Sequence, residues 1–548
     1  MSEAFFEAPE EEKKPKKKST VTYSCERCGL CNQANTKDFS YVGEGKKKIL
    51  IVGGMPSLKE DGSGNLGTGP EFNFLKDHFK ENGVYILQDC WYTTAIRCRP
   101  YAGKSPNQVQ VKSCQEKLEA LITELKPKLI ILLGELPFKS VIYPHLRGRI
   151  GGTQWTMFMG EIIPDQNRET YLAPISDPAY LLSKKRYNDG KYSKPLFERE
   201  PGTYLIWKQQ LAKILSHNNT FYKTNYAADC ITSTKIEDAK KWLEEALNWE
   251  YVSFDFETTG IKPHREGHRI VCVSISNGMY SFGFPFFEDR EFRRAWKRLM
   301  LSDVKKIAHN AMFENMWNHT LLGYYVDGWE ADTMLLAHAF NSVKPVGLKF
   351  LTYVNFGVIG YDDSADPFLK ATQEEVDKWG TNAFNQIDQA PIDDLIQYCA
   401  MDSLFTYKLW ERMKDQFSEF QDDGNKFFLE SAITLCKAQE NGFCVDMGIF
   451  EQNIKHLATL QEELEDKIMK DPDVKKWDGE EIFNFKSNKQ VSHLLFDILG
   501  VKPQGYTKGG APAVDKEVLP KYDVPFISYI LEWRRLEKIM QYMGSYIK

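Results

Sequence analysis

The sequence predicts an α/β protein of several domains that ends in a long helical segment. The chain has 548 residues, too long for one hydrophobic core, and at about 150 residues per domain we expect three domains. Strand-like apolar runs alternate with helical patterns from about residue 23, which favours parallel sheets. After Trp410, apolar residues recur at every third or fourth position, as in long helices.

Composition places the chain among ordinary globular proteins. Hydrophobic residues make up 42% and charged residues 27%, and no apolar run approaches the ~20 residues of a membrane span. No signal peptide pattern precedes the first expected strand, so we expect a cytoplasmic protein without a membrane partner. The formal net charge is −6, so binding to nucleic acid would depend on local basic patches.

Residues 1–20 form a charged low-complexity tail, in which acidic EAPEEEK precedes a lysine-rich run. We expect this tail to be disordered, and we assign no site to it. A first domain is expected over 21–215. Its pattern is a strand at 46–54, a Gly-rich loop and helix ending at Asn82, a strand at 84–89, a helix at 113–125 and a strand at 127–134.

Cysteines are concentrated in this first segment, which holds Cys25, Cys28, Cys31, Cys90, Cys98 and Cys114 among the 11 of the chain. Six thiols in one intracellular domain suggest metal binding rather than disulfides. Cys25-x-x-Cys28 precedes the first strand, and Cys98 and Cys114 bracket one loop, so the two pairs can supply four thiolate ligands. Spacing alone leaves zinc in a four-cysteine site and plain buried cysteines open.

Further motifs between about residues 23 and 185 are CERCGLC, ILIVGGMPSLKEDGSG, AIRCRP, KPKLIILLG, LRGRIGG and DPAYLL. With these motifs the segment resembles the iron–sulfur-containing branch of the uracil-DNA glycosylase superfamily. The resemblance implies an α/β/α domain whose Cys25, Cys28, Cys98 and Cys114 ligate a [4Fe–4S] cluster, with Zn²⁺ as the alternative.

Four positions depart from that family's catalytic pocket. Gly54 stands where the family has a carboxylate, and Thr94 stands where it has the asparagine that recognises the uracil edge. Asp177 replaces a histidine, and the shortened loop GNLGTG leaves Leu66 nearest to the place of a base-stacking aromatic. Because base flipping needs a shaped, hydrogen-bonding pocket, we expect a catalytically silent module for DNA binding or docking. An active uracil-DNA glycosylase is the alternative.

A second domain is expected over 222–414, where three acidic motifs follow one another. Asp255 and Glu257 are two residues apart on a Val/Phe-rich strand, so both point to one face, which can hold a divalent metal. Glu314 closes the motif NAMFE. Tyr398 lies four residues before Asp402 on an expected helix, so these two share a face.

With the landmarks ADTMLLAHAFN, VGLKFLTYVNFG and IQYCAMDSLFTYKLW, this segment resembles the ribonuclease H-like DEDD exonuclease domain, tyrosine-bearing subgroup, that proofreads in family A DNA polymerases. The resemblance implies that the acidic residues hold two Mg²⁺ or Mn²⁺ ions about 4 Å apart and that Tyr398 orients the attacking water. The implied metal ligands are Asp255, Glu257, Glu314 and Asp402. Glu314 is longer than the family's usual aspartate, and we expect carboxylate chemistry to survive.

The same resemblance implies contacts with the terminal nucleotide from Thr258 and Asn310, and packing of Ile261 against its base. Two nearby residues are better explained by structure than by catalysis. Asp332 is expected to bond locally at a helix start, and His309 is expected to be a packing residue.

Residues 415–548 are predicted to begin with two long helices broken at Gly442. The later motifs FNFKSNKQ, YTKGGAPAVDKEVL and ILEWRRLEK resemble the thumb of a family A polymerase. That resemblance implies contacts with duplex phosphates. The candidate residues are Lys486, Ser487, Lys489, Lys508, Arg534, Arg535 and Lys538.

The sequence ends at Lys548, where the palm and fingers of such a polymerase would begin, so we expect DNA synthesis to need another polypeptide that carries them. Two alternatives stay open: the polymerase is split between two chains, or this chain is a truncated product of a longer gene. The combination resembles a bacteriophage-type polymerase, acting in the host cytoplasm if phage-encoded. We expect a proofreading 3′→5′ exodeoxyribonuclease that acts in replication on a primer–template and its single-stranded 3′ end, with other replisome proteins as further partners. A non-catalytic DNA-binding scaffold is the alternative.

Overall fold

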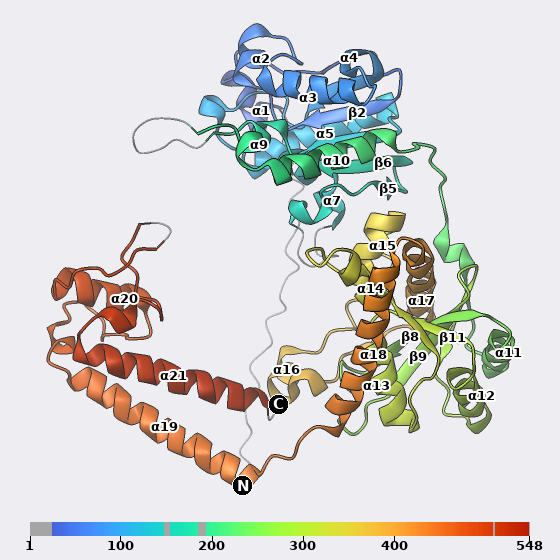
Figure 1. Ribbon diagram of the computed structural model, residues 1–548, viewed down its shortest axis with the longest axis vertical. Helices are drawn as coiled ribbons and strands as arrows, with labels where there is room; N and C mark the ends of the chain where they lie inside the picture. Colours follow the sequence, from blue (N-terminus) through green and yellow to red (C-terminus); the bar gives the residue numbers. More distant parts are fainter. Residues whose placement is uncertain (1–24, 147–153, 185–192, 508–509, 547–548) are drawn as a thin grey trace, which may run out of the picture.

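The computed structural model describes residues 25–146, 154–184, 193–507 and 510–546. Figure 1 shows a first module (blue to green), a second module below it (green to brown) and an arm of long helices (orange to red) that reaches to one side. The predicted tail over residues 1–20 lies outside the described residues. Within the described ranges, no helix is both long and apolar enough to cross a membrane.

The first module is built on a six-stranded sheet in the order β1-β3-β2-β4-β6-β5. The four central strands run parallel, and the short edge strands β1 and β5 run antiparallel to their neighbours. The central strands are almost fully buried, as in a parallel sheet with helices on both faces. The strands are β1 (Tyr41–Val42), β2 (Ile49–Gly53), β3 (Cys90–Thr94), β4 (Leu129–Leu133), β5 (Ile163–Asp165) and β6 (Thr170–Ile175).

Alternate residues of β2 contribute to two different cores, one on each face of the sheet. Ile49 and Ile51 share a core with α3 and α10, whereas Leu50 and Val52 share a core with α5 and α6. The helices of this module are α1 (Cys25–Cys28), α2 (Leu58–Ser63), α3 (Pro70–Glu81), α4 (Ile86–Asp89), α5 (Gln108–Leu125), α6 (Glu135–Val141), α7 (Tyr143–Leu146), α8 (Pro178–Leu181), α9 (Leu196–Arg199) and α10 (Pro201–Ser216), with 3₁₀ turns η1 (Leu30–Asn32), η2 (Tyr101–Gly103) and η3 (Trp155–Phe158).

The strand predicted at 84–89 is wrong. Residues 86–89 form the single helical turn α4, and the strand of this region is β3, which begins at Cys90. The Asp89 side chain accepts a hydrogen bond from the backbone N–H of Tyr85 at 2.8 Å and closes the turn. A short apolar run does not by itself distinguish a strand from a buried helical turn.

The second module has a six-stranded mixed sheet in the order β12-β11-β8-β9-β10-β7. Helix α17 lies across one face of this sheet, and α11, α12 and α13 pack against the other. The strands are β7 (Cys230–Thr232), β8 (Tyr251–Thr258), β9 (Ile270–Ser276), β10 (Ser281–Pro285), β11 (Lys305–Ala308) and β12 (Trp329–Asp332). The helices are α11 (Ile236–Ala246), α12 (Arg290–Met300), α13 (Ala311–Leu322), α14 (Thr333–Phe340), α15 (Leu348–Phe356), α16 (Gln373–Trp379) and α17 (Ile392–Lys414), with 3₁₀ turns η4 (Tyr226–Asp229), η5 (Gly380–Asn382) and η6 (Ile387–Gln389).

The two modules share one apolar core. Residues of α15 and α17 are buried in the same cluster as residues from β2, β4, α5 and η3 of the first module. At this junction the ring of Phe158 lies 5.2 Å from the ring of Phe350 on α15. The first module is therefore packed onto the second and not only tethered to it by the chain.

The arm consists of α18 (Glu419–Asn441), α19 (Met447–Lys470), α20 (Asn488–Ser492) and α21 (Pro525–Tyr546), with short turns η7 (Val474–Lys476), η8 (His493–Ile498) and η9 (Leu519–Lys521). The predicted break between two long helices at Gly442 is confirmed. Helix α18 packs against α13, and α19 packs along α21, where the Trp533 indole donates to Glu465 at 3.0 Å. Apolar residues around α20 and the start of α21 form the arm's own core.

Candidate metal centre and neighbouring sites

Strand β8 carries Asp255 and Glu257 on the face of the sheet that α17 covers. Asp255 pairs with Ser274 of β9, and Glu257 pairs with Cys272. Their side chains point to one side because successive residues of a strand alternate between faces. The sequence prediction that these two carboxylates share a face agrees with this register.

Buried serines attach helix α17 to that face. The Ser274 hydroxyl donates to the carbonyl of Cys399 at 2.6 Å, and the Ser253 hydroxyl donates to the carbonyl of Ser403 at 2.7 Å. A Cβ atom at Gly283 would lie 2.3 Å from the carbonyl oxygen of Ile396, so only glycine permits this close approach of helix and strand. The contact brings Asp402 of α17 close enough to raise the pKa of Asp255.

Glu314 reaches the site from the first turn of α13. Asp332 holds the start of this helix, because its carboxylate accepts from the backbone N–H groups of Asn310 and Ala311 at 3.0 and 2.8 Å. The same carboxylate caps α14, which confirms the structural role predicted for Asp332. Among the described residues, the buried Oε2 atom of Glu314 has no hydrogen-bond partner.

Burial raises the pKa of all four acidic residues. The pKa of Asp255, Glu257 and Glu314 lies well above the ordinary range, first because of burial and then because neighbouring carboxylates repel. Burial raises the pKa of Asp402 to about 6, although hydrogen bonds from Tyr361 and Tyr398 oppose the shift. Clustered acids of this kind suit a bound cation, which would offset both penalties.

The donor set fits a divalent metal ion. Asp255, Glu257 and Cys399 offer potential ligand atoms within 4.8 Å of one another. Burial raises the pKa of the Cys399 thiol, which lies 3.4 Å from the backbone oxygen of Asp255 and 3.8 Å from Oδ2 of that residue. Cys399 is therefore a protonated neighbour of the site, whereas the carboxylates have the hard oxygens that Mg²⁺ and Mn²⁺ prefer.

Sequence reasoning missed two residues beside Asp402. The Tyr361 hydroxyl donates to Oδ1 of Asp402 at 2.5 Å. Lys349 of α15 forms an ion pair with Asp362, and its Nζ lies 5.7 Å from the ring centroid of Tyr398. Lys349 lies in the landmark VGLKFLTYVNFG, which carries the resemblance but assigns it no role, and Tyr361 lies outside every motif quoted above.

The residues predicted to contact a nucleotide differ in their exposure to solvent. Thr258 is buried, and its hydroxyl donates to the carbonyl of Gly260 at 2.8 Å. Ile261 is 64% exposed, and Asn310 caps α13 in the left-handed conformation with φ +76°. His309 is a packing residue as expected, since burial lowers its pKa to about 4.

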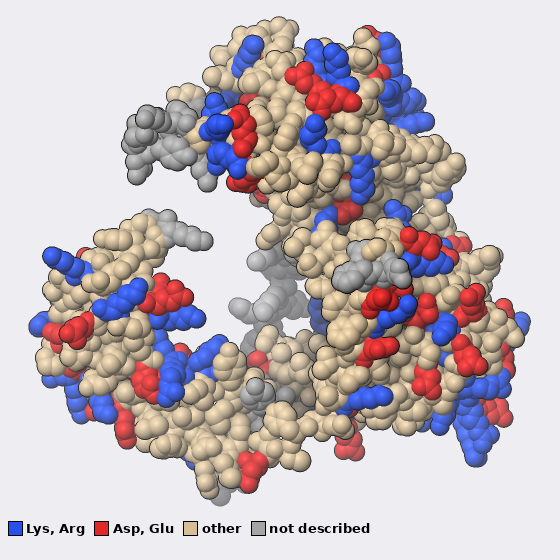
Figure 2. Space-filling model, viewed as in Figure 1, with Lys and Arg blue, Asp and Glu red and all other residues tan. Residues whose placement is uncertain are grey.

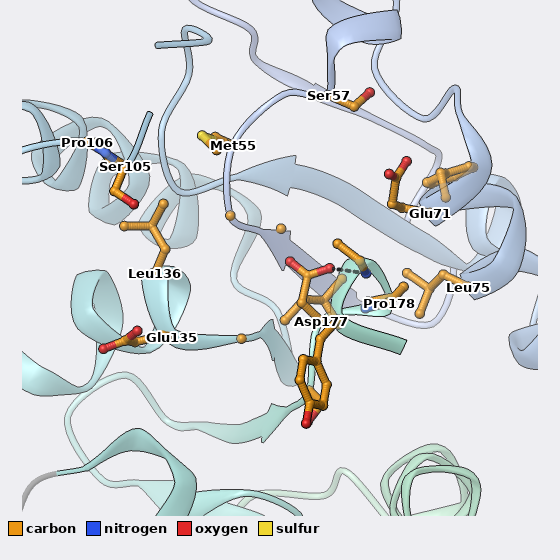
Figure 3. A pocket seen from close by; sticks show the side chains of 18 of the residues that line it. Met55, Ser57, Glu71, Leu75, Ser105, Pro106, Glu135, Leu136, Asp177 and Pro178 are labelled. Atoms are coloured by element: carbon orange, nitrogen blue, oxygen red, sulfur yellow. Dashed lines mark hydrogen bonds between the residues drawn. The ribbon is translucent and has the colours of Figure 1, made fainter. Parts of the chain in front are cut away.

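The first module contains a second concave site, a cavity of about 840 Å³ at the carboxyl ends of its strands. Asp177 and Gly54 both line this cavity, and Figure 3 shows the Asp177 carboxyl group among the lining residues. One oxygen of Asp177 accepts from the backbone N–H of Ala179 at 2.8 Å. Burial raises the pKa of Asp177 to about 6. Ligand crevices of open α/β sheets form at this edge.

Two of the four residues assigned to this pocket are corrected by the structure. Leu66 is buried in the core shared with α3 and does not line the cavity; Phe72 presents its ring there instead. Thr94 is also buried away from the cavity, because its hydroxyl donates to the carbonyl of Ile96 at 2.9 Å.

The cysteines assigned to a cluster gather beside α5. Cys98 and Cys114 are buried in one apolar cluster, and Cys28 and Cys31 pack against it. Burial is the main cause that raises the pKa of Cys114 to about 11, with smaller contributions from the neighbouring Cys28, Cys98 and Cys25. Cys31, which the sequence assignment left out, lies with the same group. Thiols gathered in this way fit a bound metal or cluster, whose positive charge would favour their thiolate form.

Several of the basic residues predicted to contact duplex phosphates form contacts within the arm itself. Arg534 is half-buried and donates to the carbonyl of Phe485 and to Asn488, whereas Arg535 pairs with Glu532 on the surface. Lys486 lies over the Trp533 ring. Ser487 caps α20, Lys489 and Lys538 are exposed, and Lys508 lies outside the described residues. Figure 2 shows basic and acidic side chains interspersed over the arm.

Three protein families match consecutive parts of the chain. Residues 39–199 match the uracil DNA glycosylase superfamily, 230–418 match the 3′-5′ exonuclease family and 454–548 match DNA polymerase family A. These matches fall on the first module, the second module and the arm.

Individual relatives follow the same division. The DNA polymerase of Bacillus phage SP01 is 23% identical over 91% of this chain, and that of Escherichia phage T5 is 25% identical over 75% of it. The type-4 uracil-DNA glycosylase of Pyrobaculum aerophilum is 29% identical over 32% of this chain, which covers 86% of that enzyme. The chain spans 59% and 47% of the length of the two phage polymerases.

The fold and the acidic site thus belong to a multidomain chain whose consecutive parts are similar to three families of known proteins. The chain combines a uracil-DNA glycosylase-like domain, a 3′-5′ exonuclease domain and a family A DNA polymerase segment, and phage family A DNA polymerases are its homologues.

Proposed function

We propose that this chain is a proofreading 3′→5′ exodeoxyribonuclease that removes nucleotides from the single-stranded 3′ end of a primer in DNA replication. The observation that carries the proposal is the convergence of four carboxylates with raised pKa, two on β8, one on α13 and one on α17. Three of them are buried and Asp255 is partly buried. Such a cluster is costly in a fold unless it has a chemical use.

The four carboxylates would hold two Mg²⁺ or Mn²⁺ ions. When bound, these ions supply charge neutralisation at the scissile phosphate and a more acidic water. Tyr398 lies one helical turn before Asp402, so its hydroxyl can orient a water at the same place. Thr258, Ile261 and Asn310 are proposed to position the terminal nucleotide, as the resemblance to the exonuclease family implies.

The test is degradation of a 3′-labelled primer–template by the full chain with Mg²⁺ or Mn²⁺. Wild type should release labelled nucleotide, and Asp255→Ala should reduce the rate by at least 10³-fold, a typical loss for a metal ligand. Asp303→Ala, which removes an exposed carboxylate of the same module, is the matched control and should keep full activity. Equal activity of both variants would exclude this site.

We also propose that the glycosylase-like module does not excise uracil. No side chain at Gly54 can position a water, and the acceptor-only Asp177 carboxylate faces the cavity. Uracil-containing single and double strands should therefore remain intact, and a measurable abasic product would contradict this reading.

Cys25, Cys28, Cys98 and Cys114 are proposed to hold a [4Fe–4S] cluster. The gathering of Cys98, Cys114 and Cys28 beside α5, together with the resemblance of this segment to the iron–sulfur-containing glycosylase branch, supports the proposal. Zinc in a four-cysteine site is the alternative. Protein purified without air should absorb broadly near ~400 nm if the cluster is present, and a colourless protein with stoichiometric zinc would support the alternative.

A palm–fingers polypeptide is the proposed partner. Several large apolar side chains of α18 and α19 are exposed, including Phe427 at 67%, Leu435 at 61% and Ile449 at 57%. Exposed apolar surface of this kind can serve as a protein interface. Adding a family A palm–fingers chain should produce DNA synthesis that Phe427→Ser with Leu435→Ser abolishes. Unchanged synthesis by this double variant would place the partner elsewhere.

A further inference from the structure

We propose that contacts from the glycosylase-like module, here called the brace, hold the candidate nuclease site in the conformation that binds metal. Tyr361 is the positioning residue through which these contacts act on Asp402. This inference rests on the proposed exonuclease function and gives the first module a structural task in it. The segment that connects the two is α15 with the residues on either side, 344–362.

Both ends of this segment are attached to the first module. Before α15, Lys344 forms an ion pair with Glu161 and donates to the carbonyl of Met159 at 3.1 Å. At the end of α15, the Gln166 side chain donates to the carbonyl of Phe356 at 2.9 Å. The first module therefore holds the segment at two points, one on each side of the helix.

Gly357, directly after α15, lies against β5 of the first module. A Cβ atom at this position would lie 1.4 Å from the carbonyl oxygen of Pro164 on β5. The backbone also has φ +69°, which favours glycine. Any side chain here would separate β5 from the end of α15.

Close-packed rings continue from this contact to the acidic site. Phe356 stacks on Phe405 of α17 at 5.4 Å, Phe405 lies 5.5 Å from Tyr361, and Tyr361 lies 5.9 Å from Tyr398. Met401, which precedes Asp402, belongs to the core shared by the two modules. Because protein interiors are packed at crystal-like density, a displaced segment changes the positions of these neighbours.

The braced segment touches the site at two residues of α17. Tyr361 donates to Oδ1 of Asp402 at 2.5 Å, and Lys349 lies over the ring of Tyr398. A hydrogen bond to a metal-binding carboxylate holds its orientation, and losing such a partner typically costs about 10- to 100-fold in metal affinity. The brace would thus keep Asp402 ready to bind a cation.

The first test measures Mn²⁺ binding to the full chain by calorimetry without DNA. Tyr361→Phe keeps the ring and removes the hydroxyl, so the dissociation constant should rise about 10-fold. In an Asp402→Asn background the same change should have no further effect. Equal effects in both backgrounds would mean that Tyr361 does not act through Asp402.

The second test perturbs the contact between modules with a matched control. Gly357 and Gly323 both end a helix with positive φ, +69° and +82°, but a Cβ atom at Gly323 meets nothing within 4 Å. Gly357→Ala should weaken Mn²⁺ binding at least fivefold, whereas Gly323→Ala should change it by less than about twofold. Equal Mn²⁺ binding by the two alanine variants would overturn the brace.

Lys344→Ala loosens the same interface without a steric clash and covers the case in which Gly357→Ala fails to fold. It should weaken Mn²⁺ binding about threefold, and adding Tyr361→Phe should give less than the product of the two effects. Independent, multiplicative effects would overturn the proposal. Because binding is read without turnover, a brace that fails is distinguishable from an exonuclease that fails: the latter would bind Mn²⁺ normally and leave DNA intact.

Discussion

The Oδ2 atom of Asp177 lies 3.9 Å from the place that a Cβ atom would take at Gly54. The two departures from the glycosylase pocket are therefore in contact with each other. A carboxylate at position 54 would face a second carboxylate in a half-closed cavity, and two like charges there repel.

We predict that Gly54→Asp will not restore uracil excision and will destabilise the protein at neutral pH. The physical reason is repulsion between the new carboxylate and Asp177. The double variant Gly54→Asp with Asp177→His removes that repulsion and should melt close to wild type. Melting curves at pH 7 measure both effects. A Gly54→Asp protein as stable as wild type would contradict the expected repulsion between the new carboxylate and Asp177.

Asp177→Asn is predicted to stabilise the protein at pH 7. In the folded state burial raises the pKa to about 6 from an ordinary value of 3.8, so wild type loses stability as the pH rises between these values. Asparagine keeps the bond from Ala179 and carries no charge. After allowance for water in the open cavity, the gain should be about 1 to 2 kcal/mol at pH 7 and near zero at pH 4. Denaturant titrations at the two pH values give the comparison, and an equal gain at both would argue against burial as the cause.

Asp255→Asn should stabilise the metal-free protein while it abolishes nuclease activity. Burial and the charge of Asp402 raise the pKa of Asp255 well above normal, so ionising it near pH 7 costs folding free energy. With a chelator the melting temperature should rise by about 3 °C. With Mn²⁺ the wild-type protein should have the higher melting temperature, because only wild type is stabilised by binding the ion. A variant that melts below wild type in the chelator would contradict the repulsion described for this cluster.

Glu314 allows a graded test of the second acidic motif. Its buried Oε2 atom has no partner among the described residues, so the carboxylate has room to serve a ligand. Glu314→Asp should keep activity within about 10-fold, and Glu314→Gln should lose at least 10²-fold, because charge matters more here than length. Single-turnover rates at saturating Mn²⁺ separate the two. Similar losses of activity in both variants would show that the length of the side chain, and not only its charge, limits the rate.

The two neighbouring arginines of α21 are predicted to differ. Arg534→Ala removes a half-buried guanidinium with two hydrogen bonds and should lower the melting temperature by several degrees. Arg535→Ala removes an exposed pair and should leave stability unchanged while weakening DNA binding in low salt. Equal melting temperatures for the two variants would contradict the burial difference.

Much of the candidate site could be predicted because its residues sit in local motifs. The alternation around Asp255 and Glu257 and the helical spacing of Tyr398 and Asp402 are short-range patterns that survive in the fold. Tyr361 could not be predicted in this way, because its bond to Asp402 spans 41 positions and depends on how α15 is packed.

The errors in the first module have the same origin. Leu66 and Thr94 were assigned to the pocket by their places along the sequence, but side-chain direction decides which residues line a cavity. The Thr94 hydroxyl donates to the carbonyl of Ile96, just after β3 ends, and Leu66 is buried in the core together with residues of α3. The joint core of the two modules was also not predicted, since no sequence pattern states which exposed face of one domain meets another.

The most direct test of the central claim is the length distribution of a 5′-labelled single strand digested by the full chain with Mn²⁺. We expect a ladder that shortens in one-nucleotide steps from the 3′ end, absent with Asp255→Asn and unchanged with Asp303→Ala. An intact strand under wild-type conditions, or immediate release of short labelled fragments from the 5′ end, would contradict it.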